Sequence, residues 1–282
     1  MSRQFQNGPC RVIRFHRQFH PRNIAACLIR ANGNLGPRPT PTYNPPVSGT
    51  LRVSEIYLSL QGESTFAGRP CVFVRLTGCD LRCSYCDTAY AFTGGKTMSL
   101  GSIQNEIAAQ AEGYPEPPLV ELTGGEPLLQ KETPALMTSL CDAGFTVLLE
   151  TSGAHDIAAI DPRVHRIVDL KCPSSGEHEK NLESNFTNLR PTDEVKCVIG
   201  TREDYEWAKA QLQKFHGQCE VLFSWVNPLT AKQQDESLKP VPADHTPITR
   251  RQLAEAIIAD RLPVRFQLQQ HKHIWPPEQK GV

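Results

Sequence analysis

The sequence predicts an α/β fold in which a mostly parallel sheet is partly closed into a barrel. From residue 51 onward, short runs rich in β-branched and aromatic residues alternate with segments of helical periodicity. Such alternation is typical of βα units, whose strands pair in parallel. Polar or glycine-rich loops follow most of the predicted strands, and ligands of parallel α/β folds bind at the carboxyl ends of strands. We therefore expect one domain over residues 51–282, with its site at that end of the sheet.

The first half of this domain contains alternating strand and helix patterns. Ser99 is a preferred N-cap and begins a helix that continues to about Ala111. Pro134 suits the first turn of a second helix, and Gly144 follows the end of that helix. The strands predicted here are 51–60, 70–77, 119–122 and 145–150.

The second half repeats the pattern. Thr201 with Asp204 three residues later begins one helix, and Thr249 with Gln252 begins the last one. Residues 229–245 are polar and proline-bearing, so we expect an excursion from the domain core. The strands predicted here are 165–170, 194–199, 221–224 and 264–268.

Residues 1–50 differ in composition from the rest of the chain. They carry seven arginines, seven prolines and no acidic residue, and they lack helical or strand periodicity. Such a segment cannot bury enough apolar surface to fold, so we expect a disordered leader. An Arg-rich targeting peptide is one explanation. A stretch translated from an early start codon is the explanation we favour.

Composition excludes several classes of protein. The chain has no net charge, and because the leader is basic, the remainder is mildly acidic and does not indicate a nucleic-acid surface. No apolar run approaches the length of a transmembrane helix, so we expect no membrane partner. Ten cysteines in 282 residues, without a secretory signal, indicate reduced thiols in a cytoplasmic protein and not a disulfide framework.

Three cysteines, Cys79, Cys83 and Cys86, fall within eight residues, directly after the predicted strand 70–77. Iron–sulfur clusters are held by cysteine thiolates, and three ligands on a [4Fe–4S] cluster leave one iron open for chemistry. A structural zinc site needs a fourth ligand, and the chain has only one Cys-x2-Cys pair. The spacing therefore favours a cluster.

This spacing, with Tyr85 before the third cysteine, resembles the cluster motif of radical S-adenosylmethionine enzymes. The run Thr123-Gly-Gly-Glu-Pro127, one βα unit later, resembles the element of that superfamily that binds the amino group of S-adenosylmethionine. Alone, this run would be an ordinary turn. The resemblance implies an open iron that chelates S-adenosylmethionine. It also implies a set of cofactor-binding residues, which are Tyr85, Asp87, Gly125, Glu126, Thr151, Ser152 and Lys171.

Some of these positions have simpler interpretations. Tyr85 is expected near the adenine, although a core aromatic residue would look the same in the sequence. Asp87 either accepts a hydrogen bond from a residue that itself contacts the ligand, or is an exposed loop acid. Lys171 is as compatible with a buried ion pair as with a cofactor contact.

Further runs resemble the 7-carboxy-7-deazaguanine synthases, a family of these radical enzymes, over most of the chain from about Val53. The matching runs are Ser59-Leu-Gln-Gly-Glu63, Gly68-Arg-Pro70, Arg75-Leu-Thr-Gly-Cys79, Cys86-Asp-Thr88 and 266–277. The resemblance implies conversion of 6-carboxy-5,6,7,8-tetrahydropterin to 7-carboxy-7-deazaguanine with loss of ammonia. It implies a Mg²⁺ ligand at Thr88 and a set of substrate-binding residues, which are Leu60, Gln61, Gly62, Arg75, Thr123 and Pro277.

The same resemblance implies partners. We expect an electron donor such as flavodoxin or ferredoxin, and a homodimer. Two other functions stay open at this point. One is an activase that places a glycyl radical on a partner enzyme, and the other is a non-catalytic protein that binds an iron–sulfur cluster or zinc.

Overall fold

The computed structural model describes residues 48–215 and 218–282. All of them belong to one compact unit, Pro41–Val282. The predicted leader over residues 1–50 therefore lies almost wholly outside the described residues. Within them, no helix is long and apolar enough to cross a membrane.

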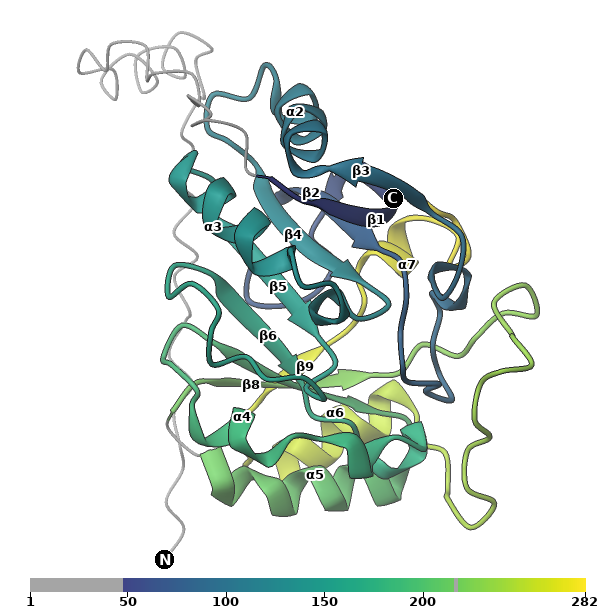
Figure 1. Cartoon of the computed structure of the whole chain (residues 1–282). Helices are drawn as coiled ribbons and strands as arrows, with labels where there is room; N and C mark the ends of the chain where they lie inside the picture. Colours follow the sequence, from purple (N-terminus) through teal and green to yellow (C-terminus); the bar gives the residue numbers. More distant parts are fainter. Residues whose placement is uncertain (1–47, 216–217) are drawn as a thin grey trace, which may run out of the picture. The chain divides into compact units, whose positions relative to one another are not determined.

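A nine-stranded sheet forms the framework of this unit, in the order β3-β1-β2-β4-β5-β6-β7-β8-β9 (Figure 1). β1 pairs antiparallel with β2 and β3, and every pairing from β2 to β9 is parallel. The predicted partial barrel with a mostly parallel sheet is confirmed. The strands are β1 (Thr50–Leu60), β2 (Pro70–Leu76), β3 (Lys96–Ser99), β4 (Leu119–Gly124), β5 (Val147–Thr151), β6 (His165–Asp169), β7 (Glu194–Ile199), β8 (Glu220–Trp225) and β9 (Arg265–Gln267).

Four longer helices cover one face of the sheet, and their apolar residues share a core with the strands (Figure 1). They are α2 (Leu100–Ala111), α3 (Thr133–Asp142), α5 (Arg202–Phe215) and α6 (Arg250–Ala259). The predicted caps are present. The Ser99 hydroxyl accepts from Ser102 N, and Thr249 and Gln252 form a reciprocal capping box. The shorter elements are α4 (Glu183–Thr187), α7 (His271–Ile274) and the 3₁₀ turns η1 (Ala89–Ala91), η2 (Pro127–Leu129), η3 (Pro173–Ser175) and η4 (His178–Lys180).

The inward face of the sheet changes from apolar to charged along the strands. Side chains alternate along a strand, so one set faces the helices and the other faces the barrel interior. The apolar part of the interior is a cluster of Tyr57, Phe66, Cys71, Phe73, Leu119, Leu148 and Ile167. On β4, Leu119 belongs to this cluster, and Glu121 and Thr123 follow on the same face and line a cavity. The carboxyl ends of the strands therefore present polar groups.

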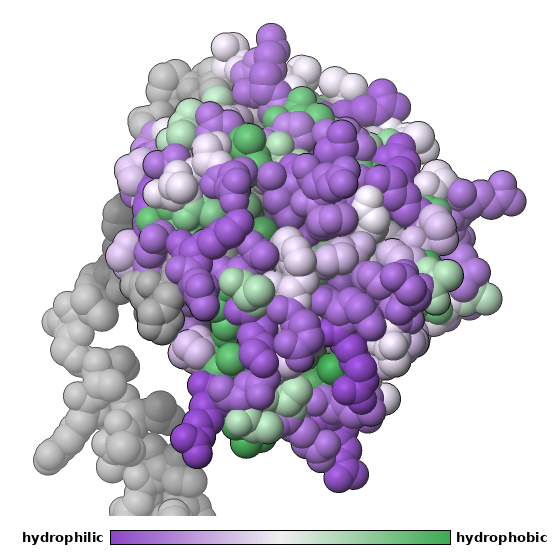
Figure 2. All heavy atoms as spheres, turned by 90° about the horizontal axis from the view of Figure 1, so that it is seen from below, coloured by the Kyte–Doolittle hydropathy of each residue, from purple (hydrophilic) through white to green (hydrophobic). Residues whose placement is uncertain are grey.

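Most predicted elements are present, with small shifts at their ends. β4 extends to Gly124, and β9 is shorter than its prediction. β3 and α7 were not predicted. The expected excursion at residues 229–245 has neither helix nor strand. On the face shown in Figure 2, apolar residues form small separate patches among hydrophilic ones.

Candidate active site

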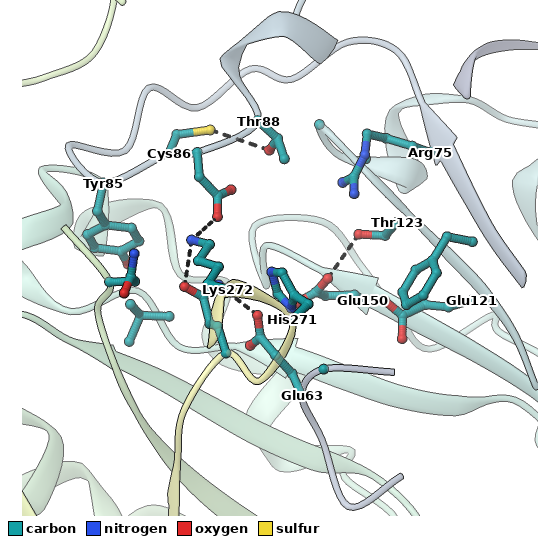
Figure 3. A pocket seen from close by; sticks show the side chains of 18 of the residues that line it. Glu63, Arg75, Tyr85, Cys86, Thr88, Glu121, Thr123, Glu150, His271 and Lys272 are labelled. Carbon is teal, nitrogen blue, oxygen red and sulfur yellow. Dashed lines mark hydrogen bonds and ion pairs between the residues drawn. The ribbon is translucent and has the colours of Figure 1, made fainter. Parts of the chain in front are cut away.

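A cavity of about 230 Å³ lies at the carboxyl ends of the parallel strands. Its walls come from β1, β2 and β4 to β7, from the loops after β1 and β2, and from the segments that follow β8 and β9 (Figure 3). All three closely spaced cysteines line it. So do all but one of the other predicted site residues, the exception being Glu126. The structure thus brings the predicted site residues together at this end of the sheet.

The cysteine loop, residues 78–88, joins β2 to η1 without regular structure. Cys79, Cys83 and Cys86 are free thiols. Burial raises the pKa of all three thiols, to about 11 for Cys79, and the Lys171 ammonium opposes that rise at each. Metal binding requires deprotonated thiols, so a bound cluster would displace these protons.

The donor set suits an iron–sulfur cluster. Three thiols on one irregular loop are soft ligands that face a shared cavity. Among the described residues, no three His, Cys, Asp or Glu side chains gather closely enough to hold a single metal ion. The Tyr85 hydroxyl, which is buried at the cavity, has no hydrogen-bond partner among the described residues.

The Gly-Gly-Glu turn packs directly against the cysteine loop. Glu126 N donates to Gly78 O at 2.8 Å. A Cβ at Gly125 would lie 2.0 Å from Gly78 O and 2.9 Å from Cys79 Cβ, so only glycine allows this approach. The predicted turn thus holds the backbone beside the first cysteine.

Glu126 lies behind the cavity wall. Its carboxylate is fully buried and accepts from Leu128 N at 2.8 Å, Thr151 Oγ1 at 2.9 Å and Ser152 N at 2.7 Å. It joins the turn after β4 to the loop after β5. Thr151 and Ser152 line the cavity themselves. The contact predicted between Glu126 and the cofactor's amino group stays a prediction.

The two remaining residues beside the third cysteine have different partners. The Thr88 hydroxyl lies 3.7 Å from Cys86 Sγ. Asp87 forms an ion pair with Lys272 of α7. Burial opposes ionisation of Asp87, but the Lys272 ammonium outweighs it and lowers the pKa of the carboxyl. Asp87 is therefore not an exposed loop acid: its carboxylate accepts from Lys272 and lies on the cavity wall.

The predicted substrate residues form the opposite wall. Arg75 donates to Glu55 Oε1 at 2.8 Å and to Tyr57 Oη at 3.0 Å, which fixes its guanidinium plane. Gln61 donates its amide to Glu121 and accepts from Glu63 N at 2.9 Å.

Gly62, Leu60 and Pro277 also line the cavity. A Cβ at Gly62 would lie 2.2 Å from His271 Nδ1, so glycine allows α7 to approach. Residues 278–282 continue along the cavity beyond Pro277.

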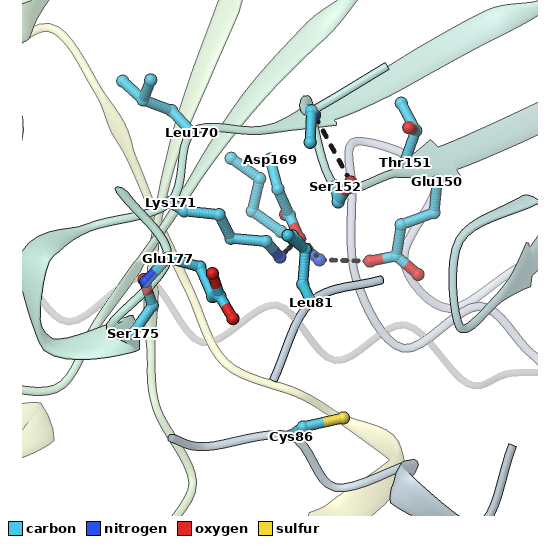
Figure 4. A network of polar contacts seen from close by, with 12 residues as sticks. Leu81, Cys86, Glu150, Thr151, Ser152, Asp169, Leu170, Lys171, Ser175 and Glu177 are labelled. Atoms are coloured by element: carbon cyan, nitrogen blue, oxygen red, sulfur yellow. Dashed lines mark hydrogen bonds and ion pairs between the residues drawn. The ribbon is translucent and has the colours of Figure 1, made fainter. Parts of the chain in front are cut away.

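A network of charged side chains lies between the wall formed by the cysteine loop and the wall formed by the predicted substrate residues (Figure 4). It was not among the predictions from the sequence. Lys196 of β7 lies 3.1 Å from Glu63 Oε2 and 3.3 Å from Asp169 Oδ1, and it also pairs with Glu150. Lys171 pairs with Asp169, which fits the ion-pair interpretation of this lysine while leaving it on the cavity wall.

The acids of this network differ in pKa. Burial raises the pKa of Glu121 well above its usual range, and the neighbouring Glu150 carboxylate adds to this. Burial acts in the same direction on Glu150, but Lys196 outweighs it and lowers the pKa to about 2. The environment therefore favours the neutral acid at Glu121 and the carboxylate at Glu150. A charged residue at an inward position of a buried strand was the signal available in the sequence.

Comparisons with known proteins agree with this geometry. Residues 73–172 match the model of the radical SAM superfamily. The chain is 44% identical over 237 residues to the 7-carboxy-7-deazaguanine synthase of Chlorobaculum tepidum, across 82% of this chain and 97% of that protein. It is 42% identical over 233 residues to the synthase of Koribacter versatilis, across 82% of this chain and 100% of that protein.

The fold has a counterpart among solved structures. The crystal structure of QueE from Escherichia coli matches with a TM-score of 0.59 at 22% identity, across 79% of this chain and 95% of that one. At this identity the likeness supports the fold alone.

Proposed function

Because the chain belongs to the 7-carboxy-7-deazaguanine synthase family of radical SAM enzymes, we propose that it converts 6-carboxy-5,6,7,8-tetrahydropterin to 7-carboxy-7-deazaguanine with release of ammonia. This reaction belongs to the biosynthesis of queuosine and other 7-deazapurines. The single observation that supports it most strongly is that one cavity is lined both by the three cysteines and by the polar wall around Gln61 and Arg75.

Cys79, Cys83 and Cys86 would ligate three irons of a [4Fe–4S] cluster and leave the fourth for S-adenosylmethionine. Together these groups supply one-electron radical chemistry, and the protein supplies binding, orientation and exclusion of water. The Tyr85 hydroxyl, which has no partner in the part of the chain that the structure describes, would be available to the nucleotide. Gly125, Thr151, Ser152 and Lys171 would complete its binding site, with Glu126 holding the Thr151–Ser152 loop in place.

The opposite wall fits a flat, carboxylated pterin. Arg75 would bind the substrate carboxylate, because its planar fork matches carboxylate geometry and its orientation is already set by Glu55 and Tyr57. Gln61, Thr123 and the backbone at Leu60 and Gly62 would provide directional hydrogen bonds to the ring, and Pro277 would contact the substrate from α7's side. The ionised Glu150 can accept from a ring N–H group, and Thr123 Oγ1 donates to it at 2.9 Å.

A Mg²⁺ ion at Thr88 completes the proposal. Magnesium commonly takes only one or two protein groups along with substrate oxygens and water. Thr88 lies beside Cys86 on the cavity wall, where its hydroxyl can meet a substrate carboxylate held by Arg75. We also propose a homodimer in the cytoplasm, reduced by a flavodoxin or ferredoxin.

The direct test is an anaerobic assay of the reconstituted protein with the pterin, S-adenosylmethionine, Mg²⁺ and a chemical reductant. The expected product has the mass and ultraviolet spectrum of a carboxylated deazapurine, and free ammonia appears with it. The Cys83→Ala variant serves as the control and should form none. Absence of product from a wild-type protein that carries a cluster would contradict the proposal and favour an activase.

A further inference from the structure

The segment 229–245 contacts two walls of the cavity although it has no regular structure. Near its start, Gln233 Nε2 donates to Pro277 O at 2.9 Å, and Lys232 pairs with Glu278 at 3.1 Å. Further along, Lys239 N donates to Arg82 O at 2.9 Å. Arg82 lies in the cysteine loop, directly before Cys83. The segment therefore joins the residues after α7 to the loop that carries the thiols.

The Lys239 side chain strengthens the contact between the segment 229–245 and the cysteine loop. Its Nζ donates to Gly176 O at 2.7 Å and pairs with Glu177 Oε2 at 2.9 Å. Its stem lies against Gly176, where a Cβ would come within 2.8 Å of Lys239 Cδ. The Glu177 side chain is only 4% exposed, whereas that of Lys239 is 44% exposed. A buried carboxylate is thus matched by a lysine that reaches in from the surface.

Glu177 also holds the cysteine loop directly, because its Oε1 accepts from Arg82 N at 2.7 Å. The backbone N–H and C=O of Arg82 are therefore both bonded, one to Glu177 and the other to Lys239 N. On the other side of Cys83, Ser84 N donates to Ser175 O at 3.0 Å and Ser84 Oγ donates to Ser174 O at 2.7 Å. Both residues that flank Cys83 are fixed by segments outside the loop.

We propose that Lys239 and Glu177 are positioning residues that hold Cys83 in the arrangement required to ligate the cluster. An irregular loop satisfies only some of its backbone groups internally, so its shape depends in part on external partners. Thiol ligands must keep fixed separations on a cluster, and a shift at Arg82 moves Cys83 with it. The inference rests on the proposed cluster but not on the identity of the substrate.

The first test measures cluster retention in the full-length protein. Wild type and Lys239→Met are reconstituted anaerobically, and iron release to an excess of ferrous chelator is followed by absorbance. Lys239→Met should release iron faster by about fivefold or more, because the charge-assisted bonds to Glu177 and Gly176 are lost. Lys239→Arg, which keeps the charge, should stay close to wild type. Lys232→Met also removes a positive charge from the segment 229–245, and it should leave the rate of iron release unchanged.

The second test needs no cluster. The full-length apoprotein is treated with iodoacetamide, and alkylation of each cysteine is followed by peptide mass spectrometry. In Lys239→Met, alkylation of Cys83, which is 8% exposed, should accelerate relative to wild type. Cys71 of β2, which is fully buried in the apolar cluster of the barrel interior, serves as the internal reference and should not change.

Two results would overturn the inference. One is iron release and Cys83 alkylation at wild-type rates in Lys239→Met. The other is equal acceleration at Cys71, which would indicate general loosening of the fold. A wild-type protein that keeps its cluster but leaves the pterin unchanged would contradict the proposed function. The comparison of iron release and Cys83 alkylation between wild type and Lys239→Met would still test the inference.

Discussion

The Asp87 carboxylate and the Lys272 ammonium form an ion pair that joins the cysteine loop to α7. The side chain of Lys272 is 4% exposed and that of Asp87 is 23% exposed. Lys272 also donates to Gln269 Oε1 at 2.7 Å. This contact brings the last part of the chain beside the residue that separates Cys86 from Thr88. Two motifs that lie far apart in the sequence, 86–88 and 266–277, therefore meet on the wall of one cavity.

Lys272→Met should destabilise the protein at neutral pH by about 1.5–3 kcal/mol, because the partly buried Asp87 carboxylate loses a charge-assisted hydrogen bond from its counter-ion. Pairing lowers the pKa of Asp87, so this stabilisation is present above the ordinary range of aspartate, about pH 4, and is lost as the pH falls through the lowered pKa. Urea unfolding at several pH values measures the difference in unfolding free energy between wild type and Lys272→Met. This difference should become smaller in acid. The Asp87→Asn/Lys272→Met double variant should recover part of the loss, and a gap independent of pH would contradict the account.

Glu121 should make the protein less stable as the pH rises. Its folded-state pKa is raised, so its contribution is complete below the ordinary glutamate pKa of about 4.3 and is lost as the pH rises through the raised value. Glu121→Gln keeps an acceptor for Gln61 and cannot ionise. Each unit of raised pKa corresponds to about 1.4 kcal/mol, so the variant should exceed wild type in unfolding free energy at pH 8. If the unfolding free energy of wild type and of Glu121→Gln changed equally with pH, the raised pKa of Glu121 would be refuted.

Gln61→Ala should weaken pterin binding and leave S-adenosylmethionine binding unchanged. Loss of a neutral hydrogen bond of about 0.5–1.5 kcal/mol predicts a several-fold rise in KM for the pterin. Equilibrium titration of both ligands separates the two effects. Asn227→Ala removes another amide that lines the cavity and serves as the control. Equal weakening in both variants would argue against a specific contact at Gln61.

Thr88→Ala should lower turnover and weaken its dependence on Mg²⁺ while the cluster's visible spectrum stays intact. The hydroxyl is the proposed ligand, so Thr88→Ser should restore most of the activity. Activity titrated against Mg²⁺ at saturating pterin makes the comparison. An unchanged Mg²⁺ requirement in Thr88→Ala would place the ion elsewhere.

Local patterns predicted most of the fold. The caps at Ser99 and Thr249 and the apolar strand runs depend on nearby residues, so they can be read from the sequence. β3 was missed because Lys96–Ser99 is too short and polar to show a strand pattern, and it forms by pairing with β1. α7 was missed because four residues show no periodicity.

The site was predicted in part. The cysteines and the Gly-Gly-Glu turn carry recognisable spacing, and the structure brings them together. The Lys196 network could not be predicted, since it depends on which strands become neighbours and which residues face inward. The position of Glu126 behind the wall likewise depends on its bonds to Thr151 and Ser152, which lie on the next strand and loop.

The most direct test of the central claim is electron paramagnetic resonance of the reduced, anaerobically reconstituted protein, with and without S-adenosylmethionine. We predict the signal of a reduced [4Fe–4S] cluster that shifts when the nucleotide is added, and no such signal in Cys79→Ala, Cys83→Ala or Cys86→Ala. A cluster signal that the nucleotide leaves unchanged, or a protein that binds only a single tetrahedral metal ion, would contradict the account.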